Sequence, residues 1–438
     1  MIIKIKRSLK IINYRLFAAL LIMGLIPTVY TTVRIFFLGQ MPGDWGFNIA
    51  SQLSWVNLLY EIVQEALILP VFFLIGKSLM NRDELQNKIR TGFILTFAVY
   101  TLLSVIIMIF AKPLVLLMAQ KDALVNETVT YIRLETIANI FSTIVRFGVI
   151  VLVTINKDKY LYYILGVQMV LSILLDIFFV SSLGVSLKFG VNGIAYTNII
   201  VNVILIVLVL VLLHRENLKV FSKDKLSFYW MKEWAKVGAY SGIESLVRNF
   251  AFMMMIVRMV NVVGEQGTFW VANNFIWGWL LLPILQLGEL VKRDCGENIE
   301  AVEKKTLGYF SITAIIVLLW LITIPLWSPF IKHILNIENY KEVFYIAIIS
   351  VGFYVLFAFN NVIDSIFYGV GKTNYMLFQS ILINTVFYGA AFILYITEIY
   401  VPNLTAIALM FAAGTALDSV LTYGMFWWYL KKNGIKIY

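Results

Sequence analysis

The chain has 438 residues, 61% of them hydrophobic, and its mean hydropathy is +0.86. Soluble globular domains use roughly 45–50% apolar residues, so the composition excludes a soluble protein and predicts a polytopic membrane protein. The net charge of +10 does not indicate nucleic acid as a partner, because membrane topology and contact with anionic lipid account for an excess of Lys and Arg.

Twelve apolar stretches are long enough to cross a bilayer, because a helix spans about 30 Å of hydrocarbon with about 20 residues. The first six lie at about 14–38, 49–76, 91–111, 127–155, 160–182 and 191–213. The second six lie at about 232–262, 268–291, 306–328, 342–370, 374–398 and 403–430. We therefore predict an all-α polytopic membrane protein with twelve transmembrane helices. The charged connections after spans two and eight are expected to form short amphipathic helices.

Lysine and arginine residues are unequally divided between the two sides of this arrangement. Connections on the side of the N-terminus carry 24 of them, and those on the other side carry five. Positively charged connections remain in the cytoplasm, and twelve spans return the chain to the side on which it began. We therefore predict a multi-pass protein of the cytoplasmic (inner or plasma) membrane with both termini in the cytoplasm. The basic start is expected to be a retained anchor, not a cleaved signal peptide.

Two segments of the chain repeat one pattern 222 residues apart. The most informative matches are Trp55 with Trp277 and Gln64 with Gln286, because neither residue type is common within a membrane span. The repeat predicts two homologous six-helix lobes, an N-lobe at 1–214 and a C-lobe at 232–438, joined by a cytoplasmic linker at 215–231. A fused pair of bundles is typical of secondary transporters, whose substrate path lies between the repeats.

Polar side chains interrupt the spans of the first half. An ionisable group at the bilayer centre costs roughly 2.5–3.5 kcal/mol, so it normally faces a cavity or a partner. In span two, Glu61 and Glu65 are four residues apart, and they cannot both ionise cheaply in a low-dielectric site. One of them could therefore carry a proton, or one could pair with an arginine such as Arg34 and be inert. The other polar residues expected to face a cleft are Asn57, Gln64, Arg146, Asp176 and Asn202.

The spans of the second half carry a similar set. In span seven, Glu244 and Arg248 are spaced for an i,i+4 ion pair in the favourable order, and Asn249 follows. In span ten, Asp364 lies on one stripe with amide side chains, among them Asn361. Carboxylate and amide oxygens suit a hard cation such as Na⁺, and a desolvated carboxylate suits H⁺. The remaining cleft candidates are Asn273, Asn274 and Gln286.

Sequence features of several enzyme classes are absent or incomplete. Gly371-Lys372-Thr373 resembles the end of a phosphate-binding loop, but the first glycine of that motif is replaced by Ile366. The two histidines, His214 and His333, are predicted on opposite faces, which excludes a histidine-based metal site or catalytic triad. Cys295 is the only cysteine and lies in a predicted cytoplasmic loop. We therefore predict that the protein is not an enzyme and uses no cofactor other than a coupling ion.

Short motifs accompany this architecture: Pro27 in span one, Gly39 at its end, Gly76 near the end of span two, and Tyr131-Ile132-Arg133-Leu134 opening span four. Together with the 6+6 repeat they resemble the multidrug and toxic compound extrusion (MATE) transporters of the MOP exporter superfamily. The resemblance covers essentially the whole chain. It implies a cation-antiporting exporter whose two lobes rock around a central cleft, with acids in spans seven and ten, here Glu244 and Asp364, as coupling sites.

One position departs from the family. Many members place an aspartate five residues before the glycine that closes span one, and that position is Arg34 here. The usual acid site of the N-lobe is therefore in doubt, and Glu61 or Glu65 could replace it or neutralise the arginine.

Three functions remain open at this point. The first is Na⁺- or H⁺-coupled export of amphipathic drugs or toxic organic compounds by a monomer in contact with membrane lipid. The second is a flippase for a lipid-linked oligosaccharide or another anionic lipid, because Arg34, Arg133, Arg146, Arg248 and Arg258 could form a cationic cleft. The third is a receptor or scaffold that does not transport. Replacing the acids and following ion-driven uptake would separate them.

Overall fold

The computed structural model describes residues 2–41, 45–157, 159–218, 220 and 225–437, and these residues form helices and turns without a β-strand. The N-terminal half contains α1 (Ile2–Lys10), α2 (Tyr14–Leu38), α3 (Trp45–Ala50), α4 (Leu53–Val63), the π-helical segment η1 (Gln64–Ile68), α5 (Leu69–Gly76), α6 (Arg82–Leu117), the short η2 (Asp122–Leu124), α7 (Val125–Thr154), α8 (Lys159–Phe179) and α9 (Val191–Arg215). Helices satisfy their own backbone groups, which a hydrocarbon environment requires.

The C-terminal half repeats this order of helices. It contains α10 (Met231–Phe252), the π-helical segment η3 (Met253–Val257), α11 (Arg258–Val262), α12 (Gln266–Phe275), the π-helical η4 (Ile276–Leu280), α13 (Leu282–Glu297), α14 (Glu300–His333), α15 (Tyr340–Gly369), α16 (Thr373–Leu382), the π-helical η5 (Ile383–Phe387), α17 (Tyr388–Ile396) and α18 (Leu404–Lys432). All twelve predicted spans are therefore helical, and the all-α fold is confirmed.

Within the described residues, nine helices are long and apolar enough to cross a membrane, and a tenth span is possible if α12–η4 and α13, which meet at an angle of 51°, form one. The other two predicted spans are α3 to α5 and α10 to α11. The first is divided by a turn and by η1, and the second carries Lys236, Glu244 and Arg248 within its helix. Helix breaks and charges inside a span are typical of functional positions.

The chain forms two compact units. One consists of Val33–Gly267, and the other combines Met1–Thr32 with Thr268–Tyr438. These units differ from the sequence halves, because α10, the first helix of the second half, packs against α4, η1 and α5. The division into lobes at 1–214 and 232–438 remains a prediction. Part of the predicted linker at 215–231, residues 219 and 221–224, lies outside the described residues.

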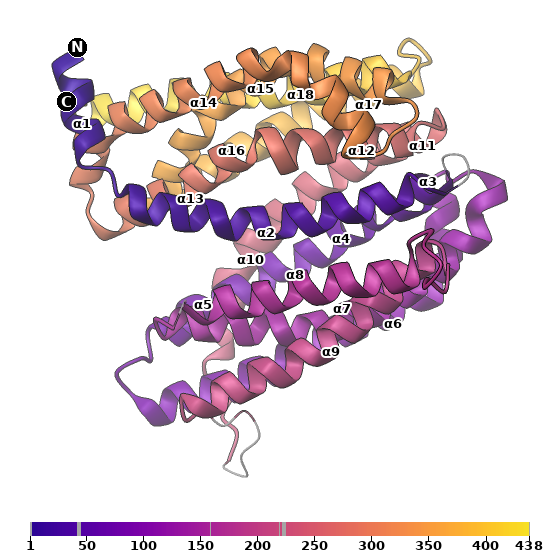
Figure 1. Cartoon of the computed structure of the whole chain (residues 1–438). Helices are drawn as coiled ribbons and strands as arrows, with labels where there is room; N and C mark the ends of the chain where they lie inside the picture. The colour runs from indigo at the N-terminus through magenta and orange to yellow at the C-terminus, as the bar shows by residue number, and fades with distance from the viewer. Residues whose placement is uncertain (1, 42–44, 158, 219, 221–224, 438) are drawn as a thin grey trace. The chain divides into compact units, whose positions relative to one another are not determined.

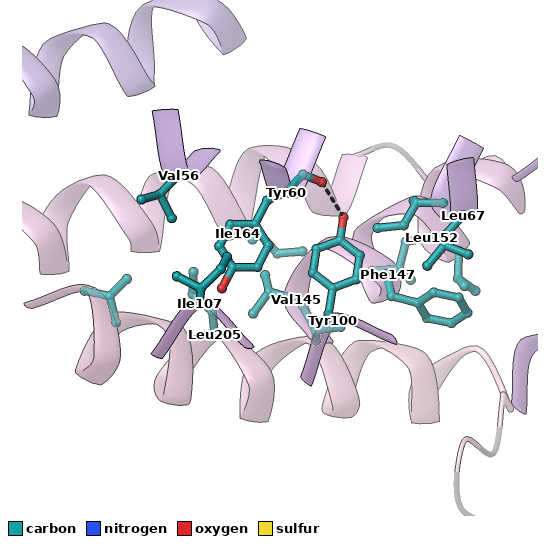
Figure 2. Close-up of a cluster of buried hydrophobic side chains, with 14 of the residues drawn as sticks. Val56, Tyr60, Leu67, Tyr100, Ile107, Val145, Phe147, Leu152, Ile164 and Leu205 are labelled. Carbon is teal, nitrogen blue, oxygen red and sulfur yellow. Dashed lines mark hydrogen bonds between the residues drawn. The ribbon is translucent and has the colours of Figure 1, made fainter. Parts of the chain in front are cut away.

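In the unit Val33–Gly267, α7 packs against α6 and α9 (Figure 1). The core of this unit consists of buried aliphatic and aromatic side chains (Figure 2). The hydroxyl of Tyr60 lies 2.7 Å from that of Ser104, and Tyr100 donates its hydroxyl to the Tyr60 carbonyl at 3.4 Å. A buried tyrosine needs such a partner for its polar end. These bonds fix α4 against α6 and so position the acids that follow on α4 and η1.

In the other unit, α15 packs against α13, α14 and α18 (Figure 1). Helix α18 begins at a defined residue because Asn403 accepts a hydrogen bond from the Ala406 amide at 2.9 Å. The short basic helix α1 was not predicted. It packs on α14, where the Ser8 hydroxyl accepts a hydrogen bond from the Gly308 amide at 2.8 Å.

The prediction of separate amphipathic helices after spans two and eight was wrong. The charged residues after span two form the first turns of the long helix α6, and those after span eight divide between α13 and α14. Asn81 explains the first case, because its side chain accepts from the Glu84 amide at 3.2 Å and starts α6 there. Cys295 likewise lies in α13 with its side chain buried, not in a loop.

Candidate functional site

Helix α10 approaches span two closely because small residues line its contact surface. An added Cβ on Gly238 would lie 2.1 Å from the Ala66 carbonyl oxygen, and one on Gly242 would lie 2.7 Å from the Ala66 Cβ. The Ser241 hydroxyl donates to the Glu65 carbonyl at 2.8 Å, and the Trp234 indole donates to the Leu67 carbonyl at 3.0 Å. Both carbonyls belong to η1. Small residues and inter-helix hydrogen bonds are the usual means of joining membrane helices.

This contact places three carboxylates around one guanidinium, a group that we call the carboxylate cluster. Arg248 of α10 lies 3.0 Å from Glu61 of α4, 2.8 Å from Glu65 of η1 and 3.3 Å from Glu244 one turn earlier on α10. The predicted Glu244–Arg248 pair is therefore confirmed. The side chains of Arg248 and Glu61 are 35% and 43% exposed, so protein does not fully cover the cluster. Three acids face one base, which leaves a surplus of negative charge when all are ionised.

Two amide side chains flank the cluster. Asn249 donates to the Leu58 carbonyl at 3.3 Å and to the Ser245 hydroxyl at 3.3 Å, which joins α10 to α4. Gln64, from η1, accepts a hydrogen bond from the exposed Arg146 of α7 at 3.0 Å. The predicted stripe of span two therefore divides, because Gln64 turns to α7 while its neighbour Glu65 turns to α10. The π-helical geometry of η1 changes the register of these side chains relative to an α-helix.

Arg34 has a different partner from the one we expected. It lies 2.9 Å from the Asp176 carboxylate of α8 and also donates to the Asn198 side chain of α9 at 3.1 Å. Asn198 in turn donates to Glu135 of α7 at 2.8 Å. Arg34 is therefore not the arginine that pairs with Glu61 or Glu65, and that alternative is wrong; the pairing partner of these acids is Arg248. Asp176 is 1% exposed, so this arginine is held in a buried network.

Asp364 and Asn361 belong to the other compact unit, on α15. Asp364 accepts a hydrogen bond from Asn360 at 2.9 Å, and Asn361 donates to the Ile284 carbonyl of α13 at 2.9 Å. Gln286 packs against Gly24, where an added Cβ would lie 2.8 Å from its amide nitrogen.

Several predicted cleft residues do not join a cluster. Asn202 donates to the carbonyl of Asn198, and Asn274 to that of Trp270, each within its own helix at 2.8 Å. Asn57 is exposed, and Asn273 is partly buried on α12. An amide that bonds to a carbonyl four residues earlier satisfies its own helix, so periodicity overestimates the number of inward-facing polar groups.

The structure also contains polar contacts that we did not single out. Gln52 and Asn261 exchange two hydrogen bonds of 2.7 and 3.1 Å, and the Trp55 indole donates to Gln52 at 3.1 Å. Gln379 of α16 is 3% exposed and interacts with Asp418 of α18. Gln52 lies three residues before the repeated Trp55, and this position was the sequence feature that could have indicated the first contact. Gln379 is a lone glutamine in an apolar span, and the sequence offered no feature that indicated the second contact.

Among the residues that the structure describes, no three His, Cys, Asp or Glu side chains lie together in a way that could hold a metal ion. Outside the membrane-spanning segments, Lys157 and Glu216 form an ion pair of 2.9 Å at the ends of α7 and α9. The hydrogen bond with Lys157, and then the one from Tyr160, lower the pKa of Glu216, and the same contact with Glu216 raises the pKa of Lys157.

Comparison with known proteins relates this arrangement to one group of transporters. The family model MatE matches residues 75–178, whereas a comparison with curated protein sequences gave no match. An inward-facing structure of a multidrug resistance MATE family transporter of the MOP superfamily has a TM-score of 0.73 and 18% identity, and the alignment covers 92% of this chain and 94% of that one.

Two further solved structures extend the comparison. An outward-facing structure of such a transporter has a TM-score of 0.68 and 18% identity, over 96% of this chain and 95% of that one. A MOP superfamily transporter from Pyrococcus furiosus, described as having a binding pocket of reverse polarity, has a TM-score of 0.68 and 18% identity, over 95% of each chain. The resemblance to the MATE transporters is therefore confirmed, in the fold along nearly the whole chain and in the sequence at residues 75–178.

Proposed function

We propose that the protein is a secondary transporter that exports amphipathic organic compounds across the cytoplasmic membrane in exchange for Na⁺ or H⁺. The carboxylate cluster is the observation that carries this proposal. It holds three acids and one arginine in a partly exposed position between membrane helices. A surplus of carboxylate inside a membrane bundle favours the binding of a cation. The fold, which is shared with inward- and outward-facing transporters, supports alternating access and is not that of an enzyme.

Arg248 gives the cluster a way to exchange cations. In the absence of a bound cation its guanidinium neutralises part of the charge of Glu61, Glu65 and Glu244. A coupling ion or a cationic substrate at these carboxylates competes with the guanidinium. A ligand shifts a conformational equilibrium only by its difference in affinity for the two states. Exchange follows if the coupling ion binds one state of the transporter better and the substrate binds the other.

A flippase for an anionic lipid is the second candidate. Arg34, which replaces the acid that the family resemblance implies, favours it, and so does the reverse polarity described for the Pyrococcus furiosus neighbour. Against it, Arg34 and Arg248 are paired with carboxylates, and Arg133 and Arg258 donate to backbone carbonyls. These contacts reduce the capacity of the arginines to hold an anionic head group, so we rank export of organic compounds first.

The arrangement in the membrane belongs to the same proposal. From the distribution of Lys and Arg we propose that both termini lie in the cytoplasm, and we propose a monomer with lobes at 1–214 and 232–438. Alternating access would then move the lobes about the residues that join them. A tag is added to either terminus, and right-side-out vesicles are treated with a labelling reagent that cannot cross the membrane. Labelling only after the vesicles are opened would support cytoplasmic termini.

Flux measurements in proteoliposomes test the function. Purified protein is reconstituted, a Na⁺ or pH gradient is imposed, and the movement of cationic dyes is followed for the wild type and for Glu61→Gln, Glu65→Gln and Glu244→Gln. We expect gradient-driven flux for the wild type and at least a tenfold loss in each variant. Glu297→Gln, at an exposed ion pair, is the matched control and should retain full flux.

Two results would contradict the proposal. Full gradient-driven activity in all three variants would remove the carboxylate cluster from the coupling mechanism. Wild-type protein that moves no dye but binds a polyprenyl-pyrophosphate lipid would favour the flippase, and protein that transports nothing under any gradient would favour a receptor.

A further inference from the structure

We propose that α1, α14, α15 and α18 form a binding site for one anionic phospholipid of the surrounding membrane. An apolar cavity between these helices holds an acyl chain, and basic side chains of α1 hold the phosphate of the head group. All four helices belong to one compact unit. The site shares no residue with the carboxylate cluster or with the coupling acids that the family resemblance implies.

The first observation is an apolar cavity of about 540 Å³. Cavities that bind small organic molecules have volumes of about 300–1,000 Å³. The walls include Ile5 of α1, Phe310 and Ala314 of α14, Phe359 of α15 and Tyr423 of α18. The rings of Phe310 and Phe359 are in contact, with centroids 6.1 Å apart. All five side chains are partly exposed, so the cavity opens at the surface of the protein.

The polar groups of the cavity wall are already used. Ser311 donates its hydroxyl to the Leu307 carbonyl at 2.7 Å, and Tyr423 donates its hydroxyl to the Leu356 carbonyl. A polar ligand buried here would lose its hydrogen bonds to water without replacement, which is unfavourable. Helices α14, α15 and α18 are each long and apolar enough to cross a membrane. The wall therefore suits a hydrocarbon chain, and the bilayer supplies one.

The second observation is an excess of basic side chains on α1. Lys6, Arg7 and Lys10 are exposed, and they take part in no ion pair among the described residues. The sequence contains no acidic residue before Asp44. Ile3, on the same helix, is 82% exposed. Exposed apolar and basic side chains on one short helix are typical of segments that lie at the surface of an anionic membrane.

Close packing holds α1 beside the cavity. An added Cβ on Gly308 of α14 would lie 2.7 Å from Cδ1 of Ile12 and 2.8 Å from the hydroxyl oxygen of Ser8. The Gly308 amide also donates to that hydroxyl at 2.8 Å. Ile5, which lines the cavity, lies one turn before Ser8, and Lys6 and Arg7 lie between them. The apolar wall and the basic charges are therefore within one turn of the same fixed helix.

The combination selects one class of ligand. A cationic compound would fit the cavity but would be repelled by α1, and a small anion would make no use of the cavity. Of the acids in the first turn of α14, Glu300 is paired with Lys304, and Glu303 is outnumbered by the bases of α1. A phospholipid with a net negative head group carries both the chain and the charge that the site can bind.

Lipid binding to the purified full chain tests the site. Delipidated protein in a neutral detergent is titrated with dioleoylphosphatidylglycerol and, separately, with dioleoylphosphatidylcholine, and native mass spectrometry counts the lipids bound. We expect one phosphatidylglycerol to bind at least tenfold more tightly than phosphatidylcholine. Lys6→Gln with Arg7→Gln should weaken that binding about twentyfold, because each base near an anionic head group contributes about fivefold. Arg82→Gln with Arg215→Gln, two exposed bases of the other unit, is the matched control.

Filling the cavity tests the acyl chain separately. Ala314→Phe should abolish retention of phosphatidylglycerol, whereas Ala98→Phe, at an exposed position of α6, should retain it. If Ala314→Phe fails to fold, competition with glycerol 3-phosphate is the second measurement, and the head group alone should not displace the lipid.

Four results would overturn the site. They are equal affinity for the two lipids, unchanged affinity in Lys6→Gln with Arg7→Gln, lipid retention in folded Ala314→Phe, and displacement of the lipid by glycerol 3-phosphate. None of these measurements uses an ion gradient or a dye, so their outcome is independent of the transport function proposed above.

Discussion

Arg34 and Arg248 occupy the same local sequence, Val-Arg-x-Phe, 214 residues apart, but their surroundings differ. Arg34 lies in a buried network with Asp176, whose side chain is 1% exposed. Arg248 faces three carboxylates, and its side chain is 35% exposed. A buried ion pair can only be broken at a high cost. A half-exposed arginine among three acids can be replaced by another cation. The number of acids that contact the arginine and the degree of burial, not the arginine itself, distinguish a structural contact from an exchange site.

The largest effect is expected from breaking the buried pair. Arg34→Leu leaves Asp176 without its cation and should destabilise the protein by about 3–5 kcal/mol. The double variant Arg34→Met with Asp176→Leu should recover most of that loss, because hydrophobic replacement of a buried pair is often neutral. Thermal unfolding in detergent measures both. If Arg34→Leu unfolds at the wild-type temperature, the network does not hold α2 and α8 together.

The next effect concerns the contact that forms the exchange site. Gly238→Ala forces a Cβ against the Ala66 carbonyl, and overpacking of this kind costs typically 1–3 kcal/mol. Gly166→Ala in α8 is the matched control, because nothing lies within 4 Å of its added Cβ, and alanine is the better helix former. We expect lower stability and slower flux in the first variant only. Equal behaviour of the two would show that α10 does not depend on close packing to present Arg248.

A smaller effect is expected when Arg248 is removed, because this arginine competes with a bound cation for the carboxylates. Removal of the internal competitor in Arg248→Met should strengthen the binding of a cationic dye about tenfold, or about 1.4 kcal/mol, while slowing its release. Fluorescence polarisation with purified protein measures this. Lys77→Met, at an exposed ion pair with Glu233, is the control. Unchanged dye affinity in Arg248→Met would mean that the guanidinium does not compete for the carboxylates.

The sequence was sufficient for some of these contacts and insufficient for others. Glu244 and Arg248 are four residues apart on one helix, so their pairing follows from helix geometry. The partner of Arg34 lies on another helix 142 residues away, and periodicity along a helix does not say which neighbour it faces. Gln64 and Glu65 are adjacent, so an α-helix already turns them about 100° apart, and the single polar stripe assigned to span two was too wide to predict that they contact α7 and α10 separately. The contact of Gln379 with Asp418 was not predicted because it depends on the packing of α16 against α18.

The smallest effect is expected at the partly exposed pair of Lys157 and Glu216, which joins the ends of α7 and α9. Lys157 lowers the pKa of Glu216, so the pair stabilises the folded chain above the ordinary pKa of a glutamate, and that contribution disappears as the pH falls through the lowered value. The raised pKa of Lys157 has the opposite sign, because its contribution is complete below the ordinary lysine pKa and disappears as the pH rises through the raised value.

Glu216→Gln should therefore differ slightly from the wild type in Tm near neutral pH and not at all in strong acid. Thermal unfolding of both proteins across the acid range measures the difference. The difference should be small because ion pairs near the surface contribute little to stability. In addition, Glu216 accepts a hydrogen bond from Tyr160 at 2.9 Å, and the amide oxygen of the Gln variant can accept the same bond. A difference that grows in acid would assign the stabilisation to another group, and flux should be the same in both proteins because the pair lies outside the carboxylate cluster.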